Sequence, residues 1–91
     1  MNKQAYVYIL KCRDRSLYTG WTNDIDSRLR AHNSGSGAKY TRGRGPVTLV
    51  YLEITSDKSA ALKREAAIKK LTREKKEKLI AQPVRTAQHS G

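Results

Sequence analysis

The sequence predicts an α+β fold in which a small three-stranded antiparallel sheet is flanked by helices, in the order β-β-α-β-α-α. Three runs of aromatic and β-branched residues indicate strands, and three segments with helical periodicity and capping residues indicate helices. The chain has 91 residues, below the size at which chains divide into several domains. We therefore expect one domain over residues 1–82, followed by a flexible tail over residues 83–91.

The strands are predicted from their composition. Residues 6–12 and residues 17–21 are rich in aromatic and β-branched side chains, and the polar stretch between them has the length of a hairpin loop. Gly20 either ends the second strand or lets another group approach its backbone closely. Residues 47–54 are almost continuously apolar, which indicates a central strand that is covered on at least one face.

The helices are predicted from their caps and their periodicity. The first lies between the second and third strands and ends at residues 33–35, and the second runs to about Leu71. Pro83 ends the third helix because proline cannot continue a helical hydrogen-bond ladder. The capping residues that the chain offers are Thr22 or Asn23, Ser56 or Asp57, and Thr72.

The charge of the chain favours a polyanionic partner. Nineteen Lys and Arg residues against eight Asp and Glu residues give a net charge of +11. Nucleic acid is the expected partner of such a surface, and an anionic membrane is the second choice. The lone Cys12 excludes an internal disulfide and a zinc finger. The sequence shows neither an apolar run of transmembrane length nor a signal-peptide pattern, so we expect a cytoplasmic protein without membrane attachment.

Glu65 is the most informative acidic residue. The apolar stripe predicted for the second helix comprises Ala61, Leu62, Ala66 and Ile68. A step of about 100° per residue places Glu65 between Leu62 and Ile68, facing the sheet. An unpaired carboxylate there would cost several kcal/mol, so it needs a cation, a positive side chain or several donors. A structural salt bridge and a functional carboxylate both fit this pattern.

Two further pairs of residues are candidates for a site. In the first helix, Ile25, Leu29 and His32 share one stripe, with Arg28 beside it. Arg28 and His32 are one turn apart and can face a phosphate together, although a solvated arginine and a boundary histidine fit equally. The remaining pair, Tyr8 and Tyr18, lies on neighbouring strands, where tyrosines ordinarily pack.

A glycine-rich basic stretch occupies residues 35–45. It lacks the pattern of a phosphate-binding P-loop, so we do not expect nucleoside triphosphate binding. A flexible loop that contacts phosphates without sequence specificity is the better interpretation. The basic residues that we expect to contact nucleic acid, in this loop and on the second helix, are Lys39, Arg42, Arg44, Lys63 and Lys69.

Taken in order, these residues resemble the GIY-YIG nuclease domain, and more narrowly its small bacterial single-domain group (YhbQ-like, UPF0213). The resemblance covers about residues 5–78 and rests on Tyr6-Val7-Tyr8, Tyr18-Thr19-Gly20, Arg28, His32, the Gly-Ala-Lys-Tyr-Thr stretch at 37–41, and Glu65. Two features depart from the family pattern: the first motif lacks its glycine, and the asparagine that homing-type members carry downstream of the glutamate has no clear counterpart.

The resemblance implies a set of functional residues. The catalytic set that it implies is Tyr8, Tyr18, Arg28, His32 and Glu65, with Lys39 as a weaker candidate. Glu65 would hold one divalent ion, Mg²⁺ or Mn²⁺, and Arg28 would clamp a phosphate oxygen. An unperturbed phenol has a pKa of about 10 and is a poor base at neutral pH. Either Arg28, His32 and the metal ion lower the pKa of Tyr8, or His32 accepts the proton.

The function predicted from these residues is a metal-dependent endonuclease that hydrolyses DNA with little sequence specificity, in DNA repair or recombination. RNA stays open as a substrate, and a monomer is assumed. Separate DNA-binding modules, which other family members attach, have no room in this chain. The alternative is a basic nucleic-acid-binding module or repair accessory protein without catalysis, which explains the charge equally well but not the position of Glu65.

Overall fold

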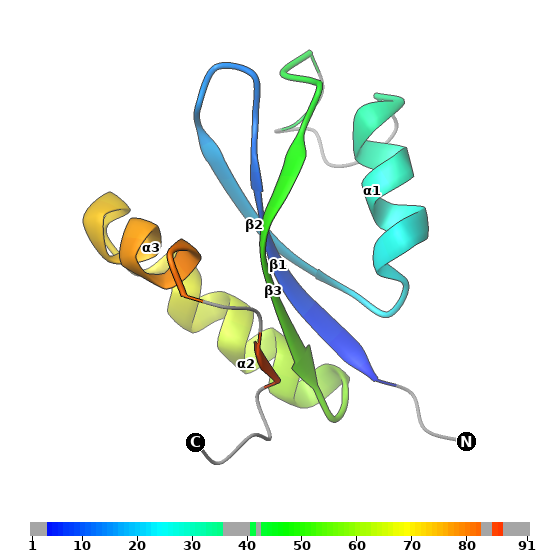
Figure 1. The fold of residues 1–91 in the computed structure, drawn as a ribbon. Coiled ribbons are helices and arrows are strands. Elements are labelled where there is room, and N and C mark those ends of the chain that lie inside the picture. The colour runs from blue at the N-terminus through cyan, green and yellow to red at the C-terminus, as the bar shows by residue number, and fades with distance from the viewer. Residues whose placement is uncertain (1–3, 36–40, 42, 83–84, 87–91) are drawn as a thin grey trace.

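The computed structural model describes residues 4–35, 41, 43–82 and 85–86 (Figure 1). Its elements in chain order are β1 (Ala5–Lys11), β2 (Leu17–Thr22), α1 (Ile25–Asn33), β3 (Thr48–Thr55), α2 (Lys58–Lys69), α3 (Arg73–Ile80) and β4 (Arg85–Thr86). The predicted α+β class and the predicted order of the first six elements are confirmed. Within the described residues, none of the helices has both the length and the apolar character needed to cross a membrane.

The sheet has the strand order β2-β1-β3-β4. The central strand β1 pairs antiparallel with both β2 and β3, and its register places Tyr8 opposite Gly20 on one side and Leu52 on the other. The two residues of β4 pair parallel with β3 at Glu53 and Ile54. The sequence does not predict β4, which falls within the expected tail; residues 83–84 and 87–91 lie outside the described part of the chain.

Alternation along β1 sends successive side chains to opposite faces of the sheet. Val7 and Ile9 belong to one buried cluster, on the face that α2 and α3 cover. Tyr8 and Leu10 belong to a second cluster, against which α1 packs. Figure 1 shows α1 on one side of the sheet and α2 and α3 on the other. Because helices cover both faces of the sheet, the side chains of neighbouring β1 residues pack against different helices.

The helix caps follow the predicted pattern with one shift. Helix α1 is capped by Asp24, whose carboxylate accepts a hydrogen bond from the Ser27 backbone N–H at 3.1 Å. The two predicted caps, Thr22 and Asn23, both precede the observed one, and Thr22 Oγ1 instead accepts a hydrogen bond from the Asp24 N–H. Asp57 and Thr72 cap α2 and α3, as predicted.

The sheet-facing stripe of α2 is narrower than predicted. Ala61 and Ile68 are fully buried, whereas Leu62 is 42% exposed and Ala66 is exposed. The predicted membership of Leu62 and Ala66 was therefore wrong, because the buried part of the helix surface is narrower than helical spacing alone indicates. Glu65 does lie on the inner stripe, since it stands at i+4 from Ala61 and three residues before Ile68.

A buried polar network fastens α2 to β3. The Glu53 side chain is almost fully buried, and both of its carboxylate oxygens accept from Arg64 Nε, at 3.0 and 3.1 Å. The Tyr51 hydroxyl donates to Glu53 Oε1 at 2.5 Å. Burial and the neighbouring carboxylate raise the pKa of Tyr51 to about 12, so this phenol stays a donor through the physiological range. The network fixes the rotation of the helix that carries Glu65.

We expect Glu53→Gln to lower the free energy of unfolding by about 1–3 kcal/mol, because a buried carboxylate with three donor contacts becomes a neutral amide that cannot accept them all. Arg64 is partly exposed, so solvent screening keeps the loss below that of a fully buried ion pair. Urea denaturation of both proteins measures the difference. A free energy equal to that of the wild type would show that the network does not contribute to stability.

Candidate active site

The phenol of Tyr8 lies over Gly20, its partner across the strand pair. A Cβ atom built at Gly20 would come within 2.6 Å of Tyr8 Oη and 2.8 Å of Tyr8 Cζ, and within 3.1 Å of Tyr18 Cε2. Real Cβ atoms essentially never approach other heavy atoms so closely. The sequence left two roles open for Gly20: ending the strand, or allowing another group to approach its backbone. The structure supports the second role, since the Tyr8 ring occupies the space where a side chain at Gly20 would lie.

Tyr8, Tyr18 and His32 form an aromatic cluster between the sheet and α1. The Tyr8 ring meets the His32 ring edge-on with centroids 5.9 Å apart, and the Tyr18 and His32 centroids are 5.3 Å apart. The two tyrosine centroids are 6.4 Å apart. Three elements therefore bring these side chains together: β1, β2 and the last turn of α1. The predicted stripe of α1 also holds, because Ile25 and Leu29 pack on the same cluster.

A chain of hydrogen bonds passes through this cluster. Tyr8 Oη lies 3.0 Å from His32 Nε2, and His32 Nδ1 lies 2.7 Å from Thr41 Oγ1. Arg28 acts on the Tyr8 phenol as a side-chain hydrogen-bonding group that lowers its pKa, and a guanidinium can only donate. The phenol proton is then free to point at Nε2, which leaves the imidazole proton on Nδ1, donated to Thr41. Tyr8 and His32 are each only 1% exposed, so the two side chains lie almost entirely within the protein.

The pKa values of the two central groups move apart. Burial raises the pKa of Tyr8 above its ordinary 10.0, and it outweighs the lowering effect of Arg28. Burial, followed by the positive charge of Arg28, lowers the pKa of His32 below 6.5. Among the protein groups alone, desolvation of the phenolate is a larger effect than Arg28, so the pKa of Tyr8 is raised. His32 is neutral at pH 7 and free to accept a proton.

Glu65 approaches the cluster from the other helical layer. Its side chain is only 16% exposed, and Lys69 Nζ lies 3.4 Å from Oε2. The negative charge of Glu65 raises the pKa of Tyr8, so the carboxylate is within electrostatic reach of the phenol. The structure therefore brings Tyr8, Tyr18, His32 and Arg28 together, and the charge of Glu65 acts on Tyr8 from α2.

The donor set around Glu65 suits a hard divalent ion. In the part of the chain that the structure describes, His, Cys, Asp and Glu side chains nowhere gather in threes as a metal site. Mg²⁺ commonly needs only one or two carboxylates, together with waters and substrate phosphate. A mostly buried carboxylate whose ion-pair partner Lys69 is more than half exposed fits that requirement, because the lysine can swing aside.

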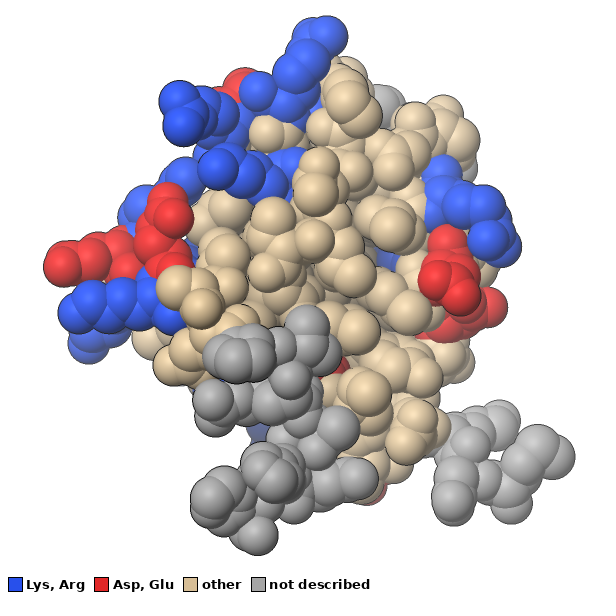
Figure 2. Space-filling model, in the orientation of Figure 1, with Lys and Arg blue, Asp and Glu red and all other residues tan. Residues whose placement is uncertain are grey.

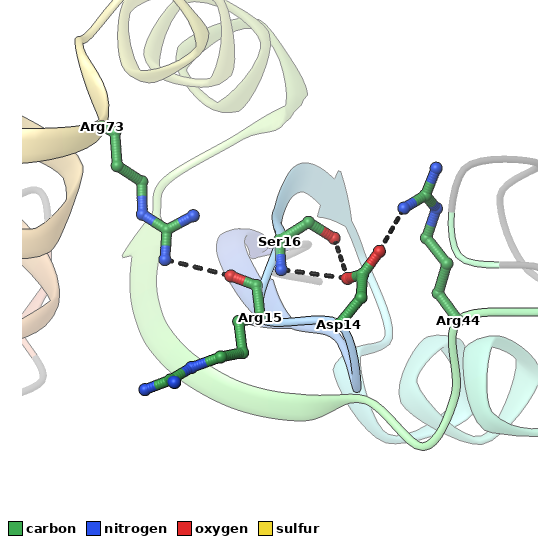
Figure 3. Close-up of polar contacts among 5 residues, drawn as sticks. All are labelled: Asp14, Arg15, Ser16, Arg44 and Arg73. Atoms are coloured by element: carbon green, nitrogen blue, oxygen red, sulfur yellow. Dashed lines mark hydrogen bonds and ion pairs between the residues drawn. The ribbon is translucent and has the colours of Figure 1, made fainter.

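The predicted nucleic-acid contacts fall in two places. Lys63 and Lys69 are exposed on α2. Arg44 is partly exposed near the β1–β2 turn, where it forms an ion pair with Asp14 (Figure 3). Lys39 and Arg42 lie outside the described residues. Figure 2 shows Lys and Arg gathered at the end of the molecule where the β1–β2 turn lies, which provides a positive surface.

One residue of the site was missed at the sequence level. Thr41 is 1% exposed and holds the second nitrogen of His32. It stands within the stretch at residues 37–41 that supports the family resemblance, but it was not assigned a role. A single threonine in a glycine-rich loop gives no separate signal, and only the fold shows that it meets His32.

Comparison with known proteins shows the family of the chain. The family model described as the GIY-YIG catalytic domain matches residues 4–78. The chain belongs to the GIY-YIG family. Among relatives of this family member, a UPF0213 protein of Clostridium perfringens is 64% identical over 76 residues, which covers 84% of this chain and 82% of the relative. A UPF0213 protein of Haloquadratum walsbyi is 60% identical over 79 residues, 87% of this chain and 89% of the relative.

Solved structures of GIY-YIG relatives share the fold. The solution structure of a UPF0213 protein from Bacillus halodurans is 51% identical, with a TM-score of 0.57, and the match covers 86% of this chain and 83% of that one. A protein from E. faecalis is 48% identical, with a TM-score of 0.59, covering 86% and 85%. The GIY-YIG domain is of the nuclease type, and the narrower group expected from the sequence is confirmed.

Proposed function

We propose that this GIY-YIG protein is a divalent-metal-dependent endonuclease that hydrolyses phosphodiester bonds in DNA. The observation that carries the proposal is the buried Tyr8–His32 hydrogen bond, with Arg28 on the same phenol and Glu65 within reach of it. If Tyr8 served only to pack the core, its hydroxyl would need neither a neutral histidine nor an arginine beside it. Together these groups offer a proton acceptor, a clamp for a phosphate oxygen and a carboxylate for a metal ion.

The proton of the attacking water leaves through Tyr8 to His32. The water gives its proton to Tyr8 Oη as the phenol passes its own proton to His32 Nε2, 3.0 Å away. The resulting imidazolium keeps its Nδ1–H bond to Thr41 Oγ1. His32 is thus the final proton acceptor and Tyr8 the relay, because a phenol with a raised pKa cannot hold negative charge at neutral pH.

Arg28 and Glu65 act on the phosphate. The guanidinium of Arg28, held at the Tyr8 hydroxyl, donates to a non-bridging oxygen as negative charge develops there. Glu65 would hold one Mg²⁺ or Mn²⁺ ion, which, when bound, supplies charge stabilisation at the phosphate and the leaving 3′ oxygen. Lys69 then releases the carboxylate and can pair with a neighbouring phosphate.

The substrate is read through its backbone. The net charge of +11 favours phosphate contacts, which carry no sequence information. A nuclease of this kind is directed by the shape of its substrate, as DNA repair and recombination require. We propose that it works in the cytoplasm as a monomer.

The rate of cleavage should rise with pH on the acid side and then stay level. Neutral His32 is the reactive form, and its pKa lies below 6.5, so the rate falls only as the pH drops below that value. The pKa of Tyr8 lies above 10.0, so we expect a plateau from about pH 7 to pH 9. Single-turnover cleavage at saturating metal measures the profile. A rate that still climbs between pH 7 and 9 would contradict His32 as the acceptor.

Nicking of supercoiled plasmid tests the proposed function as a whole. We expect nicking with Mg²⁺, loss of nicking with EDTA, and recovery when excess Mg²⁺ is added. A basic binding module without catalysis would instead shift the plasmid in a gel and leave it supercoiled. That outcome, with each metal ion tried, would reject the nuclease and favour the binding module.

A further inference from the structure

Trp21 borders a small hollow at the end of β2, apart from the aromatic cluster. The hollow has a volume of about 160 Å³ and is lined by Gln4, Ala5, Trp21, Asn23 and Lys58. The Lys58 ammonium lies over the Trp21 ring, 5.6 Å from its centre, so this exposed lysine must swing aside before a ring can stack there. Trp21 is only half-buried, while Lys58 and Asn23 are exposed, so the hollow is open to a ligand.

The chemistry of the hollow suits one planar ring attached to a phosphate. Pockets for drug-sized ligands have volumes of roughly 300–1,000 Å³, so this hollow is too small for a nucleotide cofactor. The indole of Trp21 offers a stacking surface, the amide of Asn23 can both donate and accept, and Lys58 offers a positive charge. Stacked aromatic rings next to cations are how proteins hold unpaired bases.

The hollow lies on the face of the sheet that α2 covers, and it shares that helix with Glu65. Trp21 follows Gly20 in β2, and its side chain packs with the cluster on the face covered by α2. Lys58 and Glu65 are seven residues apart on α2, so they project from the same side of the helix, about 10 Å apart along its axis. A nucleic-acid strand that places a phosphate at Glu65 therefore has its neighbouring nucleotides within reach of Trp21.

We propose that this hollow receives an unpaired base of a DNA strand, stacked on Trp21, with the adjoining phosphate at Lys58. The assignment rests on the proposed nuclease function for its biological meaning, and it names the substrate class: DNA with a single-stranded segment beside the cut. Trp21 belongs to β2, an edge strand of the sheet. The DNA strand can therefore lie along β2 and reach both the hollow and Glu65.

Intrinsic fluorescence tests the assignment directly, since Trp21 is the single tryptophan of the chain. The wild-type protein is titrated in EDTA with single-stranded dT8 and, separately, with a blunt hairpin duplex of equal charge. We expect dT8 to quench the Trp21 emission and the duplex to leave it nearly unchanged. Quenching by rU8 but not by dT8 would overturn the assignment to DNA.

Variants then separate stacking from general attraction. Trp21→Leu, followed by anisotropy of labelled dT8, should weaken binding about tenfold, as expected for one stacked base. Lys58→Gln should weaken dT8 binding more than the matched control Lys75→Gln, which removes the same charge from α3, outside the hollow. Equal losses in the two lysine variants would overturn the role of Lys58.

The result is independent of cleavage, because the titration contains no metal ion. Quenching by dT8 in a protein that never nicks DNA would retain the base site and reject the nuclease. Nicking by a protein whose tryptophan emission does not respond to dT8 would retain the nuclease and overturn the base site. Circular dichroism of Trp21→Leu shows whether that variant folds. If it does not fold, the wild-type and Lys58→Gln titrations still test the base site.

Discussion

Glu65→Gln abolishes DNA cleavage and leaves DNA binding in place: this is the largest effect that we expect. The amide is nearly the same size as the carboxylate but is a much poorer ligand for Mg²⁺. We expect the cleavage rate to fall by about 10²-fold or more, the range seen when a charge-stabilising group is removed from an active site. The assays are plasmid nicking with Mg²⁺ and gel-shift binding in EDTA.

Two controls make the Glu65 result specific. Glu74→Gln removes one negative charge from an exposed position in the first turn of α3, and it should cleave like the wild type. Binding by Glu65→Gln should be equal or slightly tighter, because the change also frees Lys69 from its ion pair. Cleavage at the wild-type rate in Glu65→Gln would remove this residue from the chemistry.

Gly20→Ala is expected to damage both stability and cleavage by adding one methyl group. Its Cβ would need the space of Tyr8 Oη and Cζ, at 2.6 and 2.8 Å, so the ring must move away from His32. Overpacking of this kind costs about 1–3 kcal/mol. Because Tyr8 is fully buried and its hydroxyl is held on two sides, we expect cleavage to fall at least about tenfold, in line with loss of a positioned proton-transfer group.

Matched variants separate strain from chemistry. Gly45→Ala adds the same methyl group where nothing lies within 4 Å of it, and it should be stable and active. Tyr8→Phe deletes the hydroxyl without adding an atom, so it should share the loss of cleavage with little strain. Urea denaturation and plasmid nicking give the two measurements. A stable, fully active Gly20→Ala protein would refute the close packing of Tyr8 on Gly20.

Much of the fold could be predicted because local signals agreed with one another. Apolar runs, cap residues and helical spacing located six elements, and Asp57 and Thr72 cap their helices as expected. The strand β4 could not be predicted, since two residues give no periodicity and their pairing depends on the open edge of β3. The burial of Leu62 was overestimated because spacing defines a helix face but not how wide a sheet covers it.

The site was less predictable than the fold. The residues of the aromatic cluster were identified, but the direction of the Tyr8 pKa shift depends on a balance between burial and Arg28 that composition does not contain. The role of Thr41 likewise required the structure, because its contact with His32 spans nine residues of chain through a loop. Distances and desolvation, rather than residue identities, decide which group takes the proton.

The position of β1 at the centre of the sheet has a consequence for biosynthesis. Its first residue pairs with Thr55, and the β1–β2 turn accepts a hydrogen bond from Arg73 through the Arg15 carbonyl (Figure 3). On the ribosome, the N-terminal hairpin emerges long before either partner has been translated. Contacts so distant in sequence slow folding. The β1 edge that later pairs with β3 therefore stays unpaired in the nascent hairpin until most of the polypeptide has left the exit tunnel.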